Sequence, residues 1–549
     1  MSSVKPHGIG FFQNNDEMKH LLTTLCLICC FSRTEAQPFQ SSISFLTDEK
    51  WWGGFVAKGY QMPYTGLTGM LDLANQGFNN QGVPLLLSNK GRYIWSDEAF
   101  RFELTGKEIN ILSDYETVKV VEAGKTLREA YLSACAKHFP PTGILPDSLL
   151  FSMPQYNTWI ELMYNQNQKD IENYADHIIN NGFPKGVLMI DDNWQKYYGN
   201  FEFKPDKFPD PEGMFARLRA QGFKTMLWVC PFVTADSPEF RELQEKGYLI
   251  RKKGSSEPAI IHWWNGYSAC YDLTNPEAFN YFVSLLKGMQ QKYGIDGFKL
   301  DAGDVIFYHP DLIDSYKKDA ATTDHTMAWA KVGLEFPFNE YRACWRMGGE
   351  ALVQRLGDKD YSWSAVALLI PDMLAAGLLG YAYTCPDLIG GGSFTAFLGI
   401  DSDKFDQKLI VRSAQTHTLM PMMQFSVAPW RILDEKHLEI CRKMAYLHVK
   451  MGSYILEYAR KSAITGEPIV RHLEYMFPHQ GFAECKDQFI LGDHYLVAPM
   501  VTPDNTRRVF LPKGNNWRDD LGKLHKGGQT ITITADIERL PYFERINNH

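Results

Sequence analysis

The sequence predicts a (β/α)8 TIM barrel flanked by N-terminal and C-terminal β-sandwich domains. Strand-like and helix-like segments alternate from about residue 155, which is the pattern of parallel strands joined by helices. Short alternating polar and apolar runs with turn residues precede this region, from about 41 to 145, and return after about 465. The 549 residues are enough for two to four domains, at least one of them with a large core.

Residues 1–36 are interpreted as upstream residues and a secretory signal peptide. Met18-Lys19-His20 precedes an 11-residue, mostly apolar run, and a small-residue site at Thr34 and Ala36 leads to Gln37. The alternative is a short membrane anchor, but the run is too short to span a bilayer. We therefore expect an exported protein, periplasmic or extracellular, without stable membrane insertion. Either Met1 or Met18 could be the start.

Residues 37–150 are assigned to the N-terminal β-sandwich domain. Alternating runs at 91–95, 100–104 and 117–121 predict strands, and helical character appears near 126–138. Residues 461–549 are assigned to the C-terminal β-sandwich domain, where strand-like runs at 495–498 and 508–511 are separated by Gly and Pro.

Residues 151–460 are assigned to the barrel. The predicted strands lie at 158–162, 187–191, 225–229 and 297–301, and the predicted helices at 168–181, 211–221, 237–246 and 279–290. Residues 363–379 are apolar nearly all round and should be buried, with Pro371 breaking or kinking any helix there.

Composition narrows the range of partners. The formal net charge of −8 argues against nucleic acid as the main partner. Seven widely spaced cysteines follow residue 37, an odd number that does not form a disulfide framework. Of these, Cys230 and Cys385 lie in predicted barrel strands and are expected to be small buried hydrophobic residues. We expect no structural metal.

A carboxylate at a strand end is the strongest single signal. The run GFKLDAGD occupies residues 297–304, so that Lys299 and Asp301 share one face of a strand and an Ala-Gly turn follows. At the carboxyl end of a barrel strand, such an aspartate occupies the position where (β/α)8 enzymes hold catalytic groups. A simple Lys–Asp ion pair is the alternative.

Several motifs, in order and spacing, resemble glycoside hydrolase family 31. They are GFKLDAGD, whose Asp304 replaces the family's Glu, WNGYSACYDLTNP at 264–276, LGDKDYSW at 356–363, and GLLG to DLIGG from 377 to 391. QFILGD at 488–493 and FLPKG at 510–514 fit the family's C-terminal sandwich. The resemblance covers about residues 155–530 and implies a retaining α-glycosidase.

By this resemblance, Asp301 is the nucleophile and Asp358 the acid/base, as a retaining mechanism needs one attacking and one proton-donating carboxyl group. Asp304 and Asp360 are their respective rivals. Lys299 would lie against the sugar hydroxyls and help to keep Asp301 ionised. Arg346 resembles the family arginine that contacts the sugar, with Arg355 as a rival, and Asp387 belongs to the strand that follows. No cofactor is implied.

The run IDDNWQ at 190–195 places Asp191, Asp192 and Trp194 at the end of a predicted strand. Adjacent carboxylates need donors, and the C4 and C6 hydroxyls of a sugar could supply them, although a carboxylate pair capping a loop is the alternative. The Asp-Asp-x-Trp form is closer to α-galactosidases of the related families 27 and 36. Trp228 and Trp264 could form sugar-stacking walls or belong to the barrel core.

A difference from the family's sequence also favours galactose over glucose as the recognised sugar. Gln424 and Ser426 stand where family glucosidases have Arg and His, which puts glucose specificity in doubt; His417 nearby is expected to be a packed or surface residue. The favoured function is therefore exo-acting, retaining hydrolysis of terminal α-galactosyl residues from an α-linked oligosaccharide or glycoconjugate. The alternatives are an α-glucosidase or α-xylosidase on the same scaffold and a catalytically silent carbohydrate-binding protein. The oligomeric state is open.

Overall fold

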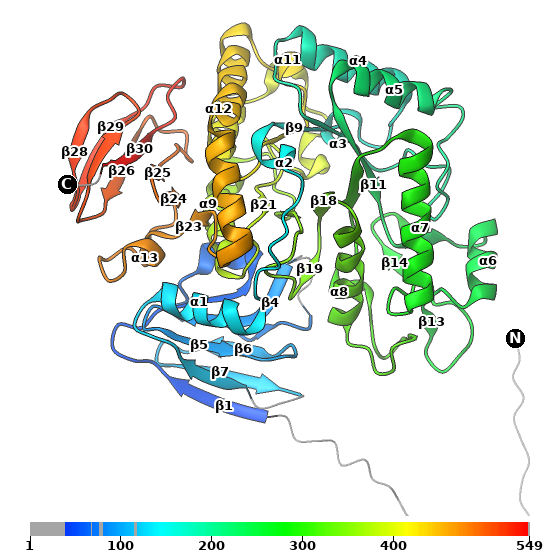
Figure 1. Cartoon of the computed structure of the whole chain (residues 1–549), viewed down its shortest axis with the longest axis horizontal. Helices are drawn as coiled ribbons and strands as arrows, with labels where there is room; N and C mark the ends of the chain where they lie inside the picture. Colours follow the sequence, from blue (N-terminus) through cyan, green and yellow to red (C-terminus); the bar gives the residue numbers. More distant parts are fainter. Residues whose placement is uncertain (1–38, 67–68, 76–80, 115–117, 547–549) are drawn as a thin grey trace, which may run out of the picture. The chain divides into compact units, whose positions relative to one another are not determined.

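A computed structural model describes residues 39–66, 69–75, 81–114 and 118–546. The predicted signal peptide, and Thr117 at the start of one predicted strand, lie outside these residues. The described chain forms a parallel barrel with β-sandwich domains before and after it in sequence, as predicted (Figure 1).

The N-terminal domain consists of two sheets. One has the order β1 (Phe39–Ser44), β7 (Glu108–Ser113), β6 (Arg101–Leu104) and β3 (Leu71–Asp72). In the other, β4 (Gln81–Ser88) pairs with β2 (Trp51–Phe55) and β5 (Arg92–Trp95), and β5 pairs with β8 (Lys119–Glu122). Burial alternates along β7, as expected for a strand with one face on a core. Helix α1 (Leu127–His138) follows and is capped by the Thr126 side chain.

The barrel is an eight-stranded sheet whose spatial order follows the chain. The strands are β9 (Gln155–Asn157), β10 (Val187–Ile190), β11 (Lys224–Val229), β16 (Gly297–Leu300), β18 (Phe338–Tyr341), β20 (Gln354–Arg355), β21 (Thr384–Cys385) and β22 (Gln424–Phe425). All seven neighbouring pairs are parallel. The ring closes where Ile389 N, just beyond β21, donates to Gln424 O in β22 at 2.9 Å.

Helices connect most of these strands. They are α4 (Gln168–Asn180), α5 (Pro211–Gln221), α7 (Pro276–Tyr293), α8 (Thr322–Val332), α9 (Trp363–Leu378) and α10 (Gln407–Thr418). The connection from β18 to β20, described throughout, has no helix and contains β19 (Cys344–Trp345), which pairs in parallel with β4 of the N-terminal domain. Helix α12 (Glu435–Thr465) follows the barrel.

The bounds of the first predicted strand are wrong, and Pro371 does not break the helix in which it lies. The first strand is β9, three residues earlier than predicted, because Asn157 Oδ1 accepts a bond from Trp159 N and opens the short helix α3 (Trp159–Leu162). Helix α9 runs through Pro371 without a break and packs on the turn η1 (Val56–Gln61). The apolar segment is mostly buried, as predicted.

An excursion leaves the carboxyl end of β11. It contains a three-stranded sheet of β12 (Phe232–Thr234), β15 (Gly266–Cys270) and β14 (Ile261–Trp263), and helix α6 (Pro238–Lys246). Strand β13 (Arg251–Lys252) pairs with β17 (Ile313–Asp314), which belongs to the loop after β16. The loops after two neighbouring barrel strands are thereby joined.

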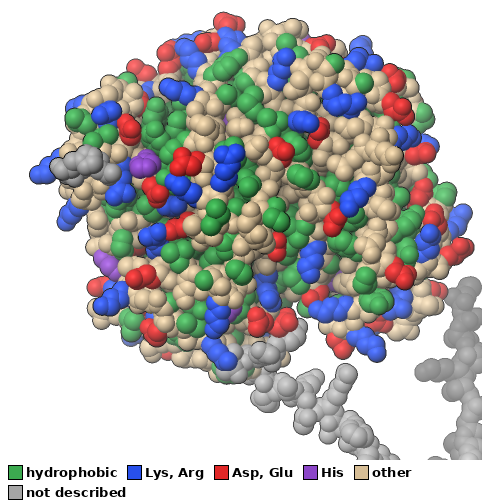
Figure 2. Space-filling view, viewed as in Figure 1, with side chains coloured by type: hydrophobic (Ala, Val, Ile, Leu, Met, Phe, Trp, Pro, Cys, Tyr) green, Lys and Arg blue, Asp and Glu red, His purple; other side chains and the backbone are tan. Residues whose placement is uncertain are grey.

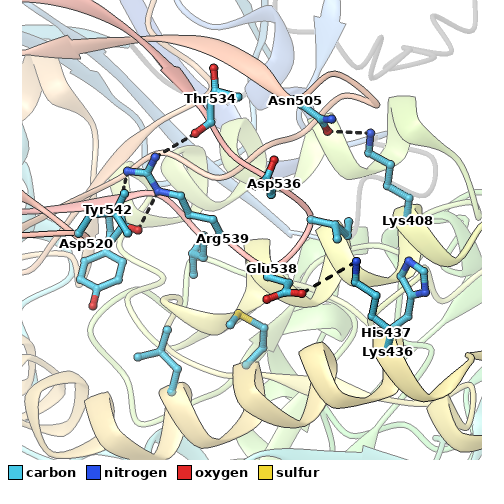
Figure 3. Close-up of a pocket in the computed structure, with 15 residues that line it drawn as sticks. Lys408, Lys436, His437, Asn505, Asp520, Thr534, Asp536, Glu538, Arg539 and Tyr542 are labelled. Carbon is cyan, nitrogen blue, oxygen red and sulfur yellow. Dashed lines mark hydrogen bonds and ion pairs between the residues drawn. The ribbon is translucent and has the colours of Figure 1, made fainter.

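The C-terminal domain has a six-stranded sheet and a two-stranded one. The first has the order β23 (Val470–Arg471), β24 (Phe489–Leu491), β25 (Tyr495–Val497), β30 (Tyr542–Ile546), β27 (Asn516–Asp519) and β28 (Leu524–Lys526), and the second pairs β26 (Thr506–Leu511) with β29 (Gln529–Thr534). Buried Arg412 of α10 donates to the carbonyls of Ala535, Asp536 and Arg539, which attaches this domain to the barrel. A cavity of about 1080 Å³ lies between α12 and this domain (Figure 3).

The seven described cysteines are free and buried, including Cys230 and Cys385 as predicted. Among the described residues, no helix has both the length and the hydropathy needed to cross a bilayer. Over the same residues, no group of side chains could hold a metal ion. On the face shown in Figure 2, Lys and Arg side chains are interspersed with Asp and Glu.

Candidate active site

Asp301 directly follows β16 at the carboxyl end of the barrel and is held by two donors. Trp228 Nε1 donates to its Oδ2 at 2.7 Å, and Ala302 N donates to its Oδ1 at 2.9 Å. The chain then turns with positive φ at Ala302 and Gly303. Gly303 is required here, because a Cβ would come within 2.2 Å of the Trp329 ring. The turn fixes the direction in which Asp301 points.

Asp358 lies three residues beyond β20 and is contacted by two arginines. Arg355 Nη1 is 2.7 Å from its Oδ1, and Arg342 Nη1 is 3.2 Å from its Oδ2. Loss of solvation alone would raise the pKa of Asp358, but Arg355 and then Arg342 outweigh it and hold the pKa below its ordinary value. About a third of the side-chain surface stays exposed, so that the carboxylate remains accessible.

Arg342 joins the two carboxylates. It follows β18, and its Nε lies 3.1 Å from Asp304 Oδ2 and 3.8 Å from Asp301 Oδ1, while Nη1 reaches Asp358. Its guanidinium carbon is 4.9 Å from the centre of the Trp264 ring, a cation–π contact. One planar cation therefore spans Asp301 and Asp358, which must face the same space.

Arg355 connects Asp358 to the barrel interior. Its Nη1 also contacts Asp387 Oδ1 at 2.5 Å, and its Nε lies 3.4 Å from Glu340 Oε1. Asp387 in addition accepts bonds from the backbone N–H groups of Lys359 and Gly392. Burial raises the pKa of Asp387 to about 6, although Arg355 opposes the shift. The cluster fixes Asp358 to two barrel strands.

Asp191 and Asp192 follow β10 and are both buried. Lys299 Nζ lies 2.6 Å from Asp191 Oδ2, so that this lysine is buried in an ion pair with Asp191. Asp192 accepts bonds from Tyr198 OH at 3.1 Å and from Asn265 Nδ2 at 2.8 Å. Burial and then the charge of Asp191 raise the pKa of Asp192 to about 7. Protein donors therefore already bind both carboxylates.

The three predicted tryptophans lie in different surroundings. Trp228 is fully buried and serves as the donor to Asp301. Trp264 is 40% exposed and stacks with Arg342, which leaves part of its ring for a ligand. Trp194 is fully buried, and its Nε1 donates to Trp228 O at 2.8 Å, so that it supports the strand that carries Trp228.

Arg346 does not reach the carboxylates. Its guanidinium group lies over Trp95 and contacts Asp97, both in the N-terminal domain. Strand β19, which ends directly before Arg346, pairs with β4 of the N-terminal domain and so places Arg346 beside that domain. The arginine that the structure brings to the site is Arg342.

The residues behind the specificity argument are core residues of the barrel. Gln424 donates to Glu340 Oε2 at 2.6 Å, and Ser426 Oγ accepts a bond from Ile160 N. His417 is fully buried between Ser413 O and Asp387 O, as a packed residue, and burial lowers its pKa to about 4.

Sequence analysis missed Arg342, Glu340, Tyr198 and Asn265 as site residues. Arg342 and Glu340 depend on β18, a four-residue strand that was not identified; its polar residues Asn339 and Glu340 gave no clear pattern. Gln81 of β4 was also missed: its Nε2 donates to the carbonyls of Arg342 and Arg355. A residue so far away in sequence has no local signal.

Comparisons with known proteins identify the family of two domains of the chain. The model of the glycosyl hydrolases family 31 TIM-barrel domain matches residues 150–458, and that of the glycosyl hydrolase family 31 C-terminal domain matches residues 466–548. The chain is 32% identical over 418 residues to "Myogenesis-regulating glycosidase" of Mus musculus, covering 74% of this chain and 58% of that protein. It is 26% identical over 415 residues to "Alpha-xylosidase" of Emericella nidulans, covering 71% and 52%.

A solved structure shares the fold. The Flavobacterium johnsoniae GH31 dextranase, complexed with glucose, superposes with a TM-score of 0.81 at 20% identity over 93% of this chain and 66% of that one. This chain spans between half and three fifths of the length of the two curated relatives. More than half of the chain matches the TIM-barrel-domain model. The chain belongs to glycoside hydrolase family 31.

Proposed function

We propose that this chain is an exo-acting, retaining α-glycosidase. The observation that carries the proposal is the pair Asp301 and Asp358, which one guanidinium group, that of Arg342, contacts at the carboxyl end of the barrel. Active sites of (β/α)8 enzymes lie at this end. The substrate is proposed to be an α-linked oligosaccharide or glycoconjugate.

In the proposed mechanism, an Asp301 oxygen attacks the anomeric carbon as the glycosidic C–O bond breaks. Asp358 gives its proton to the leaving oxygen, then takes one from the water that hydrolyses the glycosyl ester, and Asp301 is released as a carboxylate. The Trp228 and Ala302 donors orient Asp301, leaving it little freedom to rotate away from the sugar.

Asp358 must be protonated before it can act as the acid. Arg355 and Arg342 lower its pKa in the structure without substrate, and a low pKa favours the ionised form that cannot donate. Proton donation therefore needs a higher pKa of Asp358 in the substrate complex, which a weaker contact with one of these guanidinium groups would provide. Arg342 is the candidate, because it lies at the barrel mouth and shares its charge with Asp301 and Asp304.

The identity of the sugar is the finer part of the proposal. The name of the Emericella nidulans relative supports an α-xyloside, and an α-glucoside has the same hydroxyl configuration at C2, C3 and C4. An α-galactoside is the second candidate, favoured by the adjacent acceptors Asp191 and Asp192. The case for galactose is weaker than it was from the sequence alone, because Lys299, Tyr198 and Asn265 already donate to these carboxylates, which therefore need sugar hydroxyls less.

Nitrophenyl α-xyloside, α-glucoside and α-galactoside, measured side by side, test the proposal. Hydrolysis of at least one is expected, and kcat/KM ranks the sugars. Asp301→Ala should fall below detection on all three because no glycosyl ester can form, and added azide should restore turnover with a β-configured glycosyl azide as product. A wild-type protein that hydrolyses none of them would instead support a silent carbohydrate-binding protein.

A further inference from the structure

An apolar groove of about 870 Å³ is lined in part by Trp264, the ring over which Arg342 lies. The excursion after β11 forms one wall and the loop after β16 forms the other. Its apolar lining includes Ile260, Ile261, Trp263, Trp264, Phe307 and Leu312. Ile260 and Leu312 are 49% and 63% exposed, which is unusual for side chains of this type gathered at one place.

The groove is built on a fixed frame. The pairing of β13 with β17 joins its two walls, with Arg251 opposite Asp314 and Lys252 opposite Ile313. Behind them lies a buried cluster in which Trp263 stacks on Phe232 with ring centres 4.4 Å apart. The groove therefore does not depend on a loop that must first fold around a ligand.

The same cluster reaches the nucleophile. Its members include Trp228, which donates to Asp301, and Ala302, the residue after Asp301. On the open side, Trp264 lines the groove and also stacks on Arg342, which contacts both carboxylates. Trp228 and Ala302 are themselves fully buried, so the half-exposed ring of Trp264 is the apolar surface that joins the groove to Arg342 and the two carboxylates.

We propose that this groove binds the leaving part of the substrate, and that this part is apolar: an alkyl chain or an aromatic ring. The inference rests on the proposed glycosidase function and adds the class of aglycone. A sugar leaving group would need polar partners for its hydroxyls, whereas this surface offers mainly carbon. Charged and imidazole groups such as Lys252, Glu257, His262 and His309 also line the groove.

Glycosides of primary alcohols test the inference, because their leaving groups differ little in basicity. Methyl, butyl, octyl and benzyl α-glycosides of the preferred sugar are compared by kcat/KM, below the micellar concentration of the octyl compound. An increase of about tenfold or more from methyl to octyl is expected, since each buried methylene group favours binding. The benzyl compound shows whether the groove prefers a ring or a chain.

Variants locate the effect. Leu312→Gln and Ile260→Gln, at exposed positions that tolerate a polar residue, should each lower the octyl-to-methyl ratio at least threefold. Ile464→Gln on α12, a 76% exposed position, is the matched control and should leave the ratio unchanged. Unfolding temperatures of all three variants verify that they are folded.

The outcomes separate the two proposals. Turnover of the methyl glycoside without a chain-length effect, or an effect that Leu312→Gln and Ile260→Gln leave intact, overturns the apolar aglycone and leaves the glycosidase function standing. No turnover of any glycoside overturns both. A dimer in light scattering that Leu312→Gln dissociates would assign the groove to a second copy of the chain and overturn the inference.

Discussion

Two neighbouring carboxylates, Asp358 and Asp360, differ in their contacts. Both are exposed, but the Asp358 carboxylate is held by Arg342 and Arg355, whereas that of Asp360 makes no hydrogen bond or ion pair with the described residues. Asp358→Ala should lower kcat/KM on a disaccharide by about 10²- to 10⁴-fold, and less on nitrophenyl substrates, which need little acid assistance. Asp360→Ala should stay near the wild type. The reverse order of effects in a steady-state assay would transfer the acid/base role to Asp360.

Asp192 makes the stability of the protein depend on pH. Its folded pKa of about 7 lies above the value near 3.9 of an unfolded aspartate. The folded state therefore binds more protons between about pH 4 and 7, so that stability falls as pH rises through this range and then levels off. Above pH 7 the ionised group costs on the order of a few kcal/mol.

Asp192→Asn, neutral at every pH, should remove this cost. The variant's Tm minus that of the wild type is expected to increase from pH 4 to pH 7 and to stay constant above it. Asp360→Asn, at an exposed position, provides the comparison, and Asp192→Asn should show the larger change with pH. A flat profile for Asp192→Asn in calorimetry would mean that Asp192 is ionised in the folded protein well below pH 7.

The close contact between Gly303, in the turn after β16, and Trp329 can be tested by substituting two glycines that have similar backbone conformations. Gly303 and Gly522 have φ of 79° and 85°, but only Gly303 has a neighbour that an added Cβ would hit. Gly522→Ala should cost about 1–2 kcal/mol for backbone strain alone, and Gly303→Ala about 1–3 kcal/mol more for the clash with Trp329. Urea unfolding measures both, and equal losses would contradict the contact.

Gly303→Ala should also reduce activity, because Asp301 is only two residues away. The expected effect is on kcat more than on KM, as the nucleophile moves relative to a bound sugar. Normal activity in a destabilised Gly303→Ala protein would show that the turn does not orient Asp301.

The secondary structure elements explain what could be predicted from the sequence. Strands β10, β11 and β16 are mostly apolar runs of four to six residues next to clear helices, and their predicted bounds differ from the observed ones by no more than one residue. Strands β20, β21 and β22 have two residues each, too few for a periodic signal. Asp301, Asp358 and Asp191 followed from motifs, whereas Arg342 required knowing where β18 ends.

At the scale of the whole molecule, Arg412 connects the barrel to the C-terminal domain. Arg412→Met would leave the carbonyls of Ala535, Asp536 and Arg539 without their donor, at an expected cost of about 2–4 kcal/mol. The loss should appear in urea unfolding as a lower midpoint. Arg241→Met, which breaks only the exposed pair with Asp236, should cost less than about 1 kcal/mol; similar losses in the two variants would contradict the attachment.

Export is a further prediction for the whole chain. Expression from Met18 in a Gram-negative host should give a periplasmic protein that begins near Gln37, if the charged start, apolar run and small-residue site form a signal peptide. N-terminal sequencing of the purified protein decides this. If the purified protein still contained residues 18–36, the signal-peptide prediction would be wrong.

The bond from Gln81 to the backbone of Arg342 and Arg355 has a consequence for how this protein can change in evolution. The N-terminal domain is outside the two matched family models, and such a segment would ordinarily be free to be exchanged or lost. Here it supplies the amide that holds both arginines of the active site, and β19 completes one of its sheets. Residues 81–82 and 342–355 should therefore be inherited together, and homologues that lose the first should show substitutions in the second.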